Sequence, residues 1–157
     1  MIPCFFLYLQ IQKKAVGRIV AIDYGTKRVG IAVSDPSQMI AGGLTTVKTN
    51  EALDYLQEYF LRENVESLVI GYPKKMNNQE SESFLHIMQF EKKFKERFPS
   101  IPVIRVDERF TSSLALDAMI RGGMKKKDRQ KKENLDRISA AIILQSYLES
   151  RDYKNSR

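Results

Sequence analysis

Short apolar runs rich in β-branched residues recur along the chain and predict strands. They lie at 18–23, 29–34, 44–48, 67–71 and 101–106. The first two runs are separated by the turn-like stretch 24–28, so they predict a hairpin. Apolar residues at helical spacing predict a helix with Leu53, Leu56 and Phe60 on one face, and further helices over 81–98, 112–121 and 134–150.

Local sequence sets the expected ends and inner faces of these helices. Thr49 or Asn50 is expected to cap the first helix, and Gly122-Gly123 to end the third. The polar stretch 74–80 is expected to be a loop. The residues expected to face inward on the second and fourth helices are Phe84, Ile87, Met88 and Phe94, and Leu135, Ile138, Ile142 and Leu148.

The predicted order of elements is β-β-β-α-β-α-β-α-α. A strand reached through a helix is normally parallel to its neighbour, whereas a hairpin is antiparallel. The fold class is therefore α/β, with a mixed five-stranded sheet and helices on both faces. We expect one domain over 17–150, an N-terminal extension over 1–16 that lies outside the fold, and a C-terminal tail over 151–157.

Composition narrows the class of partner. The chain has 26 Lys and Arg against 19 Asp and Glu, a net charge of +7, which favours a polyanion. Eight basic residues against three acidic ones fall between 121 and 137, so this segment is either a solvated loop or a nucleic-acid contact. The apolar stretch 1–9 is far short of the roughly 20 residues that span a bilayer, so no membrane partner is expected. With Cys4 as its single cysteine, the chain is expected in the reducing cytoplasm.

Three carboxylates lie at strand ends or at the start of a helix, where catalytic or metal-binding residues are often found. Asp23 ends an apolar strand, Glu108 follows another, and Asp136 falls in the first turn of the last helix. Functional groups gather at the carboxyl ends of parallel strands, so these three can meet there. Together they could bind one or two divalent ions, whereas taken singly Asp136 could complement a helix dipole and Asp23 a turn.

The residues needed for a P-loop, a histidine-based catalytic triad or a zinc cluster are missing from the sequence. The segment from Gly25 to Gly30 has the spacing of a P-loop but continues with Ile31-Ala32 in place of Lys-Ser/Thr. His86 is the only histidine and lies in a predicted helix, which excludes a histidine-based triad or a zinc cluster.

Four blocks of sequence resemble, in order, those of the YqgF family, also called RuvX. They are Arg18-Ile-Val-Ala-Ile-Asp23-Tyr-Gly25-Thr-Lys-Arg28-Val-Gly30-Ile-Ala-Val-Ser-Asp35-Pro, Gly71-Tyr-Pro73, Asp107-Glu-Arg-Phe-Thr-Ser112, and Asp136-Arg-Ile-Ser-Ala-Ala-Ile-Ile-Leu-Gln145. The resemblance covers about 17–148. It implies a ribonuclease H-like fold and a RuvC-like nuclease that matures the 5′ end of pre-16S ribosomal RNA.

The family's acidic cluster maps onto Asp23, Glu108 and Asp136 as catalytic residues and as ligands of Mg²⁺ or Mn²⁺, with Asp107 as an alternative to Glu108. RuvC has four acids in its site, and Ser139 stands here where the fourth would be. This departure counts against two-metal cleavage of a junction. A Holliday junction resolvase acting on branched DNA is one alternative function. A non-catalytic protein that binds RNA or the ribosome is another.

Basic and hydroxyl side chains around this cluster are expected to contact the phosphates of structured RNA, either free pre-16S rRNA or the precursor on the ribosome. Such contacts give affinity and salt dependence rather than sequence choice. The protein is expected to act as a monomer or a homodimer. The residues expected to bind nucleic acid are Lys27, Arg28, Arg109, Thr111, Lys125, Lys126 and Lys127.

Overall fold

The computed structural model describes residues 17–73, 82–108 and 111–156. The strands in this part of the chain are β1 (Arg18–Tyr24), β2 (Arg28–Ser34), β3 (Ala41–Lys48), β4 (Val65–Pro73) and β5 (Val103–Glu108). The helices are the 3₁₀ turn η1 (Thr49–Glu51), α2 (Ala52–Arg62), α3 (Glu82–Arg97), α4 (Thr111–Arg121), α5 (Lys126–Arg129) and α6 (Lys132–Asn155). The extension 1–16 and the predicted loop 74–80 lie outside the described residues.

The strands form one sheet in the order β3-β2-β1-β4-β5. The first three strands are antiparallel neighbours, because each is joined to the next by a short connection. β4 and β5 are parallel to their neighbours, because a helix precedes each of them. The predicted mixed five-stranded α/β fold is therefore confirmed.

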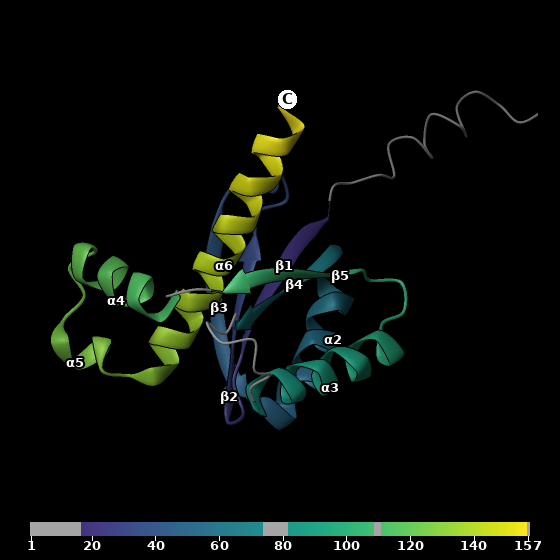
Figure 1. The fold of residues 1–157 in the computed structure, drawn as a ribbon, viewed down its shortest axis with the longest axis horizontal. Coiled ribbons are helices and arrows are strands. Elements are labelled where there is room, and N and C mark those ends of the chain that lie inside the picture. Colours follow the sequence, from purple (N-terminus) through teal and green to yellow (C-terminus); the bar gives the residue numbers. More distant parts are fainter. Residues whose placement is uncertain (1–16, 74–81, 109–110, 157) are drawn as a thin grey trace, which may run out of the picture.

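Helices cover both faces of this sheet, α2 and α3 on one and α6 on the other (Figure 1). Side chains of β1 alternate between the two cores: Val20 and Ile22 pack with α2 and α3, whereas Ile19 and Ala21 pack with α6. α4 packs against α6. Among the described residues no helix combines the length and the apolar character needed to cross a bilayer.

The first two helices differ from prediction in their cap and their inner face. Thr49 does not cap α2: its hydroxyl donates a hydrogen bond to the carbonyl oxygen of Gly25 at 2.6 Å and ties the helix entry to the β1–β2 turn. On α3, Ile87 and Phe94 are buried as predicted, but Met88 is 42% exposed. Phe90 is buried where Met88 was expected to be, and its ring packs against that of Tyr24.

The last helix is longer at both ends than the pattern predicts. It begins at Lys132 and continues through Asn155, so residues 151–155 are helix and not a tail. The guanidinium of Arg151 donates hydrogen bonds to the side-chain and backbone oxygens of Gln38, at 2.5 and 3.1 Å. Of the predicted inner residues Leu148 is buried and the other three are half-buried, whereas Ala140, Ile143 and Leu144 form most of the contact with the sheet.

Candidate active site

Asp23 lies at the carboxyl end of β1 on the face that α6 covers. The strand alternation that buries Ile19 and Ala21 against α6 gives Asp23 the same side, and Tyr24 the opposite one. Asp23 is half-buried and pairs in register with Gly30 of β2. An apolar strand thus ends in a carboxylate held at the edge of the α6 core.

Gly30 is the point at which α6 comes closest to the sheet. A Cβ atom on this residue would lie 2.1 Å from the carbonyl oxygen of Asp136 and 2.4 Å from its carbonyl carbon. Only a residue without a side chain allows the helix backbone to approach so closely. Because Gly30 is the cross-strand partner of Asp23, the same contact brings Asp136 to the strand position beside Asp23.

Gly43 on β3 makes a second close approach, since a Cβ there would lie 2.7 Å from Cγ of Arg137. The Gly42-Gly43 pair is typical of a break before a strand at 44–48, but both residues belong to β3. A glycine within a strand that is otherwise apolar is the signal that could have identified Gly30 and Gly43.

Asp136 is held by an ion pair with Arg28. Nε of Arg28 donates to Oδ2 of Asp136 at 3.1 Å, and the two side chains are about 32% and 26% exposed. The sequence predicts Asp136 in the first turn of the last helix. Because α6 begins at Lys132, Asp136 lies in its second turn instead. Its placement follows from contacts with β2 and does not depend on the helix N-terminus. Arg28, predicted to contact phosphate, is thus also a partner of a candidate carboxylate.

The remaining predicted site residues are placed only in part. Glu108 ends β5 in register with Pro73, and its side chain, that of Thr111 and the whole of Arg109 lie outside the described part of the structure. Asp107 is exposed and pairs in register with Tyr72, whose side chain belongs to the core under α3. Among the side chains that are described, no three His, Cys, Asp or Glu residues are grouped closely enough to hold a metal ion.

The basic segment is more ordered than a loop. Lys126 and Lys127 belong to the short helix α5, and Lys125 immediately precedes it; all three are exposed. The side-chain amide of Asn134 donates to the carbonyl oxygen of Asp128 at 3.0 Å, which ties α5 to the start of α6. Figure 1 shows α4 and α5 projecting beside the first half of α6, away from the sheet. Lys27, at the tip of the β1–β2 hairpin, is also exposed.

A buried ionic cluster on the other face of the sheet has no local signal in the sequence. Glu91 of α3 is 3% exposed, accepts a hydrogen bond from the hydroxyl of Tyr72, and pairs with Arg105 at 3.0 Å and Lys95 at 2.9 Å. Burial alone would raise the pKa of Glu91, but the hydrogen bonds from these partners outweigh it and hold the pKa below its ordinary value. Burial also raises the pKa of Tyr72. The cluster fixes the end of β4 to β5, next to the strand end that carries Glu108.

Comparison with known proteins gives consistent matches. The family model described as "RuvX: Holliday junction resolvase" matches residues 17–150. A Phocaeicola vulgatus protein named "Putative pre-16S rRNA nuclease" is 56% identical over 138 residues, which make up 88% of this chain and 99% of that protein. A Porphyromonas gingivalis protein of the same name is 52% identical over 137 residues, 87% of this chain and 99% of that protein.

Two solved structures share the fold. RuvC of Thermus thermophilus in complex with a Holliday junction substrate matches with a TM-score of 0.53 and 18% identity, over 86% of this chain and 95% of that chain. Another Thermus thermophilus RuvC structure matches with a TM-score of 0.50 and 17% identity, over 85% and 95% of the two chains. The predicted ribonuclease H-like fold is therefore confirmed.

Proposed function

Because the chain belongs to the RuvX family, we propose that it is a divalent-metal-dependent nuclease that hydrolyses phosphodiester bonds in pre-16S ribosomal RNA. The observation that supports the proposal is the close contact between Gly30, the cross-strand partner of Asp23, and the backbone of Asp136 on α6. Carboxylates near the end of β1, together with the exposed lysines at 125–127, suit a reaction on a phosphate backbone. The substrate assignment rests on the names of the relatives.

The donor chemistry of these residues fits a hard divalent cation. Carboxylate oxygens are the ligands that Mg²⁺ and Mn²⁺ prefer. Asp23 and Asp136 are only partly buried, so a hydrated ion and a phosphate could reach them. We propose that they bind the ion together with Glu108, which ends β5. When bound, the ion would activate water and neutralise charge on the phosphate.

The chain's own residues would hold and orient the substrate. Arg28 on β2 holds the Asp136 carboxylate by a hydrogen bond, and this would fix one side of the proposed ion site. We propose that Lys27, Arg109 and Thr111 contact phosphates beside the carboxylates. Lys125, Lys126 and Lys127 would contact the backbone further away and contribute affinity without sequence preference.

A second candidate function is resolution of four-way DNA junctions. It is favoured by the description of the family model and by the fold shared with RuvC, one of whose structures holds a Holliday junction. A resolvase would act as a homodimer, because a junction presents two equivalent strands to be cut. The RNA nuclease is preferred because the relatives above 50% identity carry that name.

Cleavage assays on two substrates test the proposal. A pre-16S leader RNA and a synthetic four-way DNA junction are each incubated with Mg²⁺ or Mn²⁺ and the wild type or Asp23→Asn. Asp54→Asn is the matched control, because Asp54 is exposed on α2, across the sheet from α6. We expect Asp23→Asn to lose RNA cleavage by at least about 10³-fold while retaining RNA binding and fold, and Asp54→Asn to match the wild type.

Each alternative predicts a different result. Junction cleavage without RNA cleavage would establish the resolvase. Binding of RNA with no metal-dependent cleavage of either substrate would establish the non-catalytic binder. Unchanged turnover in Asp23→Asn would refute the carboxylate mechanism whatever the substrate.

A further inference from the structure

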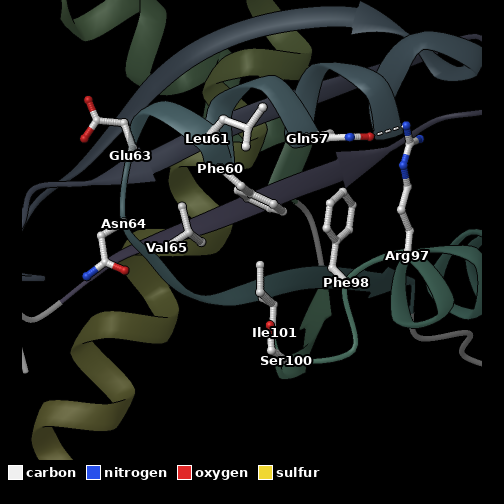
Figure 2. A pocket seen from close by; sticks show the side chains of 10 residues that line it. All are labelled: Gln57, Phe60, Leu61, Glu63, Asn64, Val65, Arg97, Phe98, Ser100 and Ile101. Carbon is white, nitrogen blue, oxygen red and sulfur yellow. Dashed lines mark hydrogen bonds between the residues drawn. The ribbon is translucent and has the colours of Figure 1, made fainter.

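A pocket of about 490 Å³ lies at the opposite end of the parallel strands from Asp23. It is formed by the end of α2, the start of β4, and the connection from α3 to β5 (Figure 2). The rings of Phe60 and Phe98 meet edge to face, 4.9 Å apart, and Val65 and Ile101 complete its apolar wall. Leu61, on the rim, is 81% exposed. An apolar hollow with a nearly fully exposed leucine beside it suits an apolar occupant.

The described part of the chain begins next to this pocket. The backbone N–H of Arg18 donates to the carbonyl oxygen of Asn64, a lining residue, at 2.8 Å. A Cβ atom on Gly17 would lie 3.1 Å from that same oxygen and 2.9 Å from the backbone nitrogen of Glu66. Residues 1–16 are therefore attached to the fold at the edge of the pocket.

Residues 1–16 contain an apolar stretch that could occupy the apolar pocket. Residues 10–16 separate this stretch from Gly17 and can span up to about 23–25 Å when extended, which is ample for a site at the point of attachment. Lys13 and Lys14 precede Gly17 by only a few residues. Glu63 and Glu66 lie close to the same point, where Glu63 pairs with Arg18 and Glu66 accepts a hydrogen bond from Gln38. The large apolar and aromatic residues in the apolar stretch, residues 2–9, are Ile2, Phe5, Phe6, Leu7, Tyr8 and Leu9.

The segment is additional to the shared domain. The family match begins at residue 17. Relatives from Phocaeicola vulgatus and Porphyromonas gingivalis align over 99% of their own length but only 88% and 87% of this chain. A role for residues 1–16 would therefore lie outside the part of the chain that the family model matches, and it is independent of the proposed nuclease site.

We propose that residues 2–9 dock into this pocket of the same chain, cover Leu61, and pack against Phe60 and Phe98. The segment is the occupant because it is tethered at the rim and is apolar where the pocket is apolar. Docking removes two exposed apolar surfaces from water at once, and the tether keeps the local concentration of the segment high.

The single cysteine of the chain makes this contact measurable. Cys4 lies within the docking segment, so a second cysteine at the pocket would form a disulfide with it only if the two approach to within about 7 Å between Cα atoms. Ser100→Cys places a thiol on the pocket lining. Ser37→Cys is the matched control: it is an exposed serine in a turn, next to Gln38, whose side-chain amide donates to the carbonyl oxygen of Gly17 at 2.6 Å.

Oxidation of each full-length variant at low micromolar concentration, followed by non-reducing electrophoresis and mass spectrometry, gives the rate of intramolecular disulfide formation. We expect Ser100→Cys to cross-link at least about ten-fold faster than Ser37→Cys, because docking raises the local thiol concentration above that of a free tether. Adding Leu61→Gln to Ser100→Cys should slow cross-linking several-fold. Adding Ile120→Gln, which replaces a 50% exposed residue on α4, should leave the rate unchanged.

Three outcomes would overturn the proposal. Equal rates for the two cysteines would mean that the segment has no preferred site. A faster rate at Ser37 would place it on the exposed side chains of Met39 and Ile40 instead. Disulfide-linked dimers in place of the intramolecular product would mean that the pocket takes the segment of a second copy.

Discussion

Replacing Gly30 by alanine would put a methyl group where α6 lies closest to the sheet. The new carbon would be 2.1 Å from the carbonyl oxygen of Asp136 and 3.0 Å from the backbone nitrogen of Arg137. Ordinary carbon–oxygen contacts are about 3.3 Å or longer, so the helix has to move away by roughly 1 Å. The obstacle is helix backbone, which cannot rotate aside as a flexible side chain can.

The displacement sets the size of the expected effects. Overpacking of this kind costs about 1–3 kcal/mol, and we expect the upper half of that range because backbone atoms of two residues are involved. For a chain of this length the melting temperature should fall by roughly 5–10 °C. A shift of about 1 Å in Asp136 should lower the cleavage rate by on the order of 10²-fold, because it moves one carboxylate relative to Asp23.

Thermal unfolding followed by circular dichroism, together with the RNA cleavage assay, measures both effects. Gly42→Ala is the control on the neighbouring strand β3, where a Cβ atom would meet nothing closer than the carbonyl oxygen of Val33 at 3.9 Å. That substitution should be neutral or stabilise the protein by up to about 1 kcal/mol, since alanine loses less backbone entropy than glycine on folding. If Gly30→Ala unfolded and cleaved like Gly42→Ala, the inferred contact between Gly30 and Asp136 would be wrong.

Two further predictions concern charge. Replacing the three lysines at 125–127 by glutamine should weaken RNA binding for every sequence and lower the salt dependence of log K by up to about 2 units, at roughly 0.7 per lost contact with a single strand. The same change at Lys92 and Lys93, exposed on α3, should have little effect in a binding titration at several salt concentrations. Glu91→Gln should destabilise the protein by about 1–3 kcal/mol at neutral pH, since hydrogen bonds to a buried carboxylate are lost. Because the pKa of Glu91 is held below 4.5, its contribution is complete above that pH and disappears as the pH falls through the lowered value. Urea unfolding from pH 7 to 3 should therefore show the difference from wild type shrinking below pH 4.5, and a constant difference would contradict the assigned ion pairs.

The apolar runs predict the strands well because the central strands of this sheet are buried on both of its faces. Each of β1 to β5 forms at a predicted apolar run, although β3 begins earlier, at Ala41, and β5 extends to Glu108. The alternation along β1 already puts Asp23 on one definite side of the sheet. The position of Asp136 relative to Asp23 could not be predicted in the same way. It depends on a contact between Gly30 and a helix more than 100 residues later, which no local periodicity contains.

Helix ends and faces were less predictable for similar reasons. Thr49 has the composition of a cap, but its hydroxyl is used by the carbonyl oxygen of Gly25. Glu91 would be assigned to solvent by its charge, yet Tyr72 and Arg105 provide the partners that allow its burial. The extension of α6 to Asn155 follows from the hydrogen bonds between Arg151 and Gln38. In each case the deciding partner is distant in sequence.

The double attachment of α6 restricts which changes of length the helix can accept. Asp136 is fixed against Gly30 near one end, and Arg151 is fixed to Gln38 near the other. A helix turns by about 100° per residue, so one residue inserted or deleted between 137 and 150 would rotate one attachment away from its partner. Viable homologues should therefore vary this helix by substitution and place their insertions in the surrounding connections.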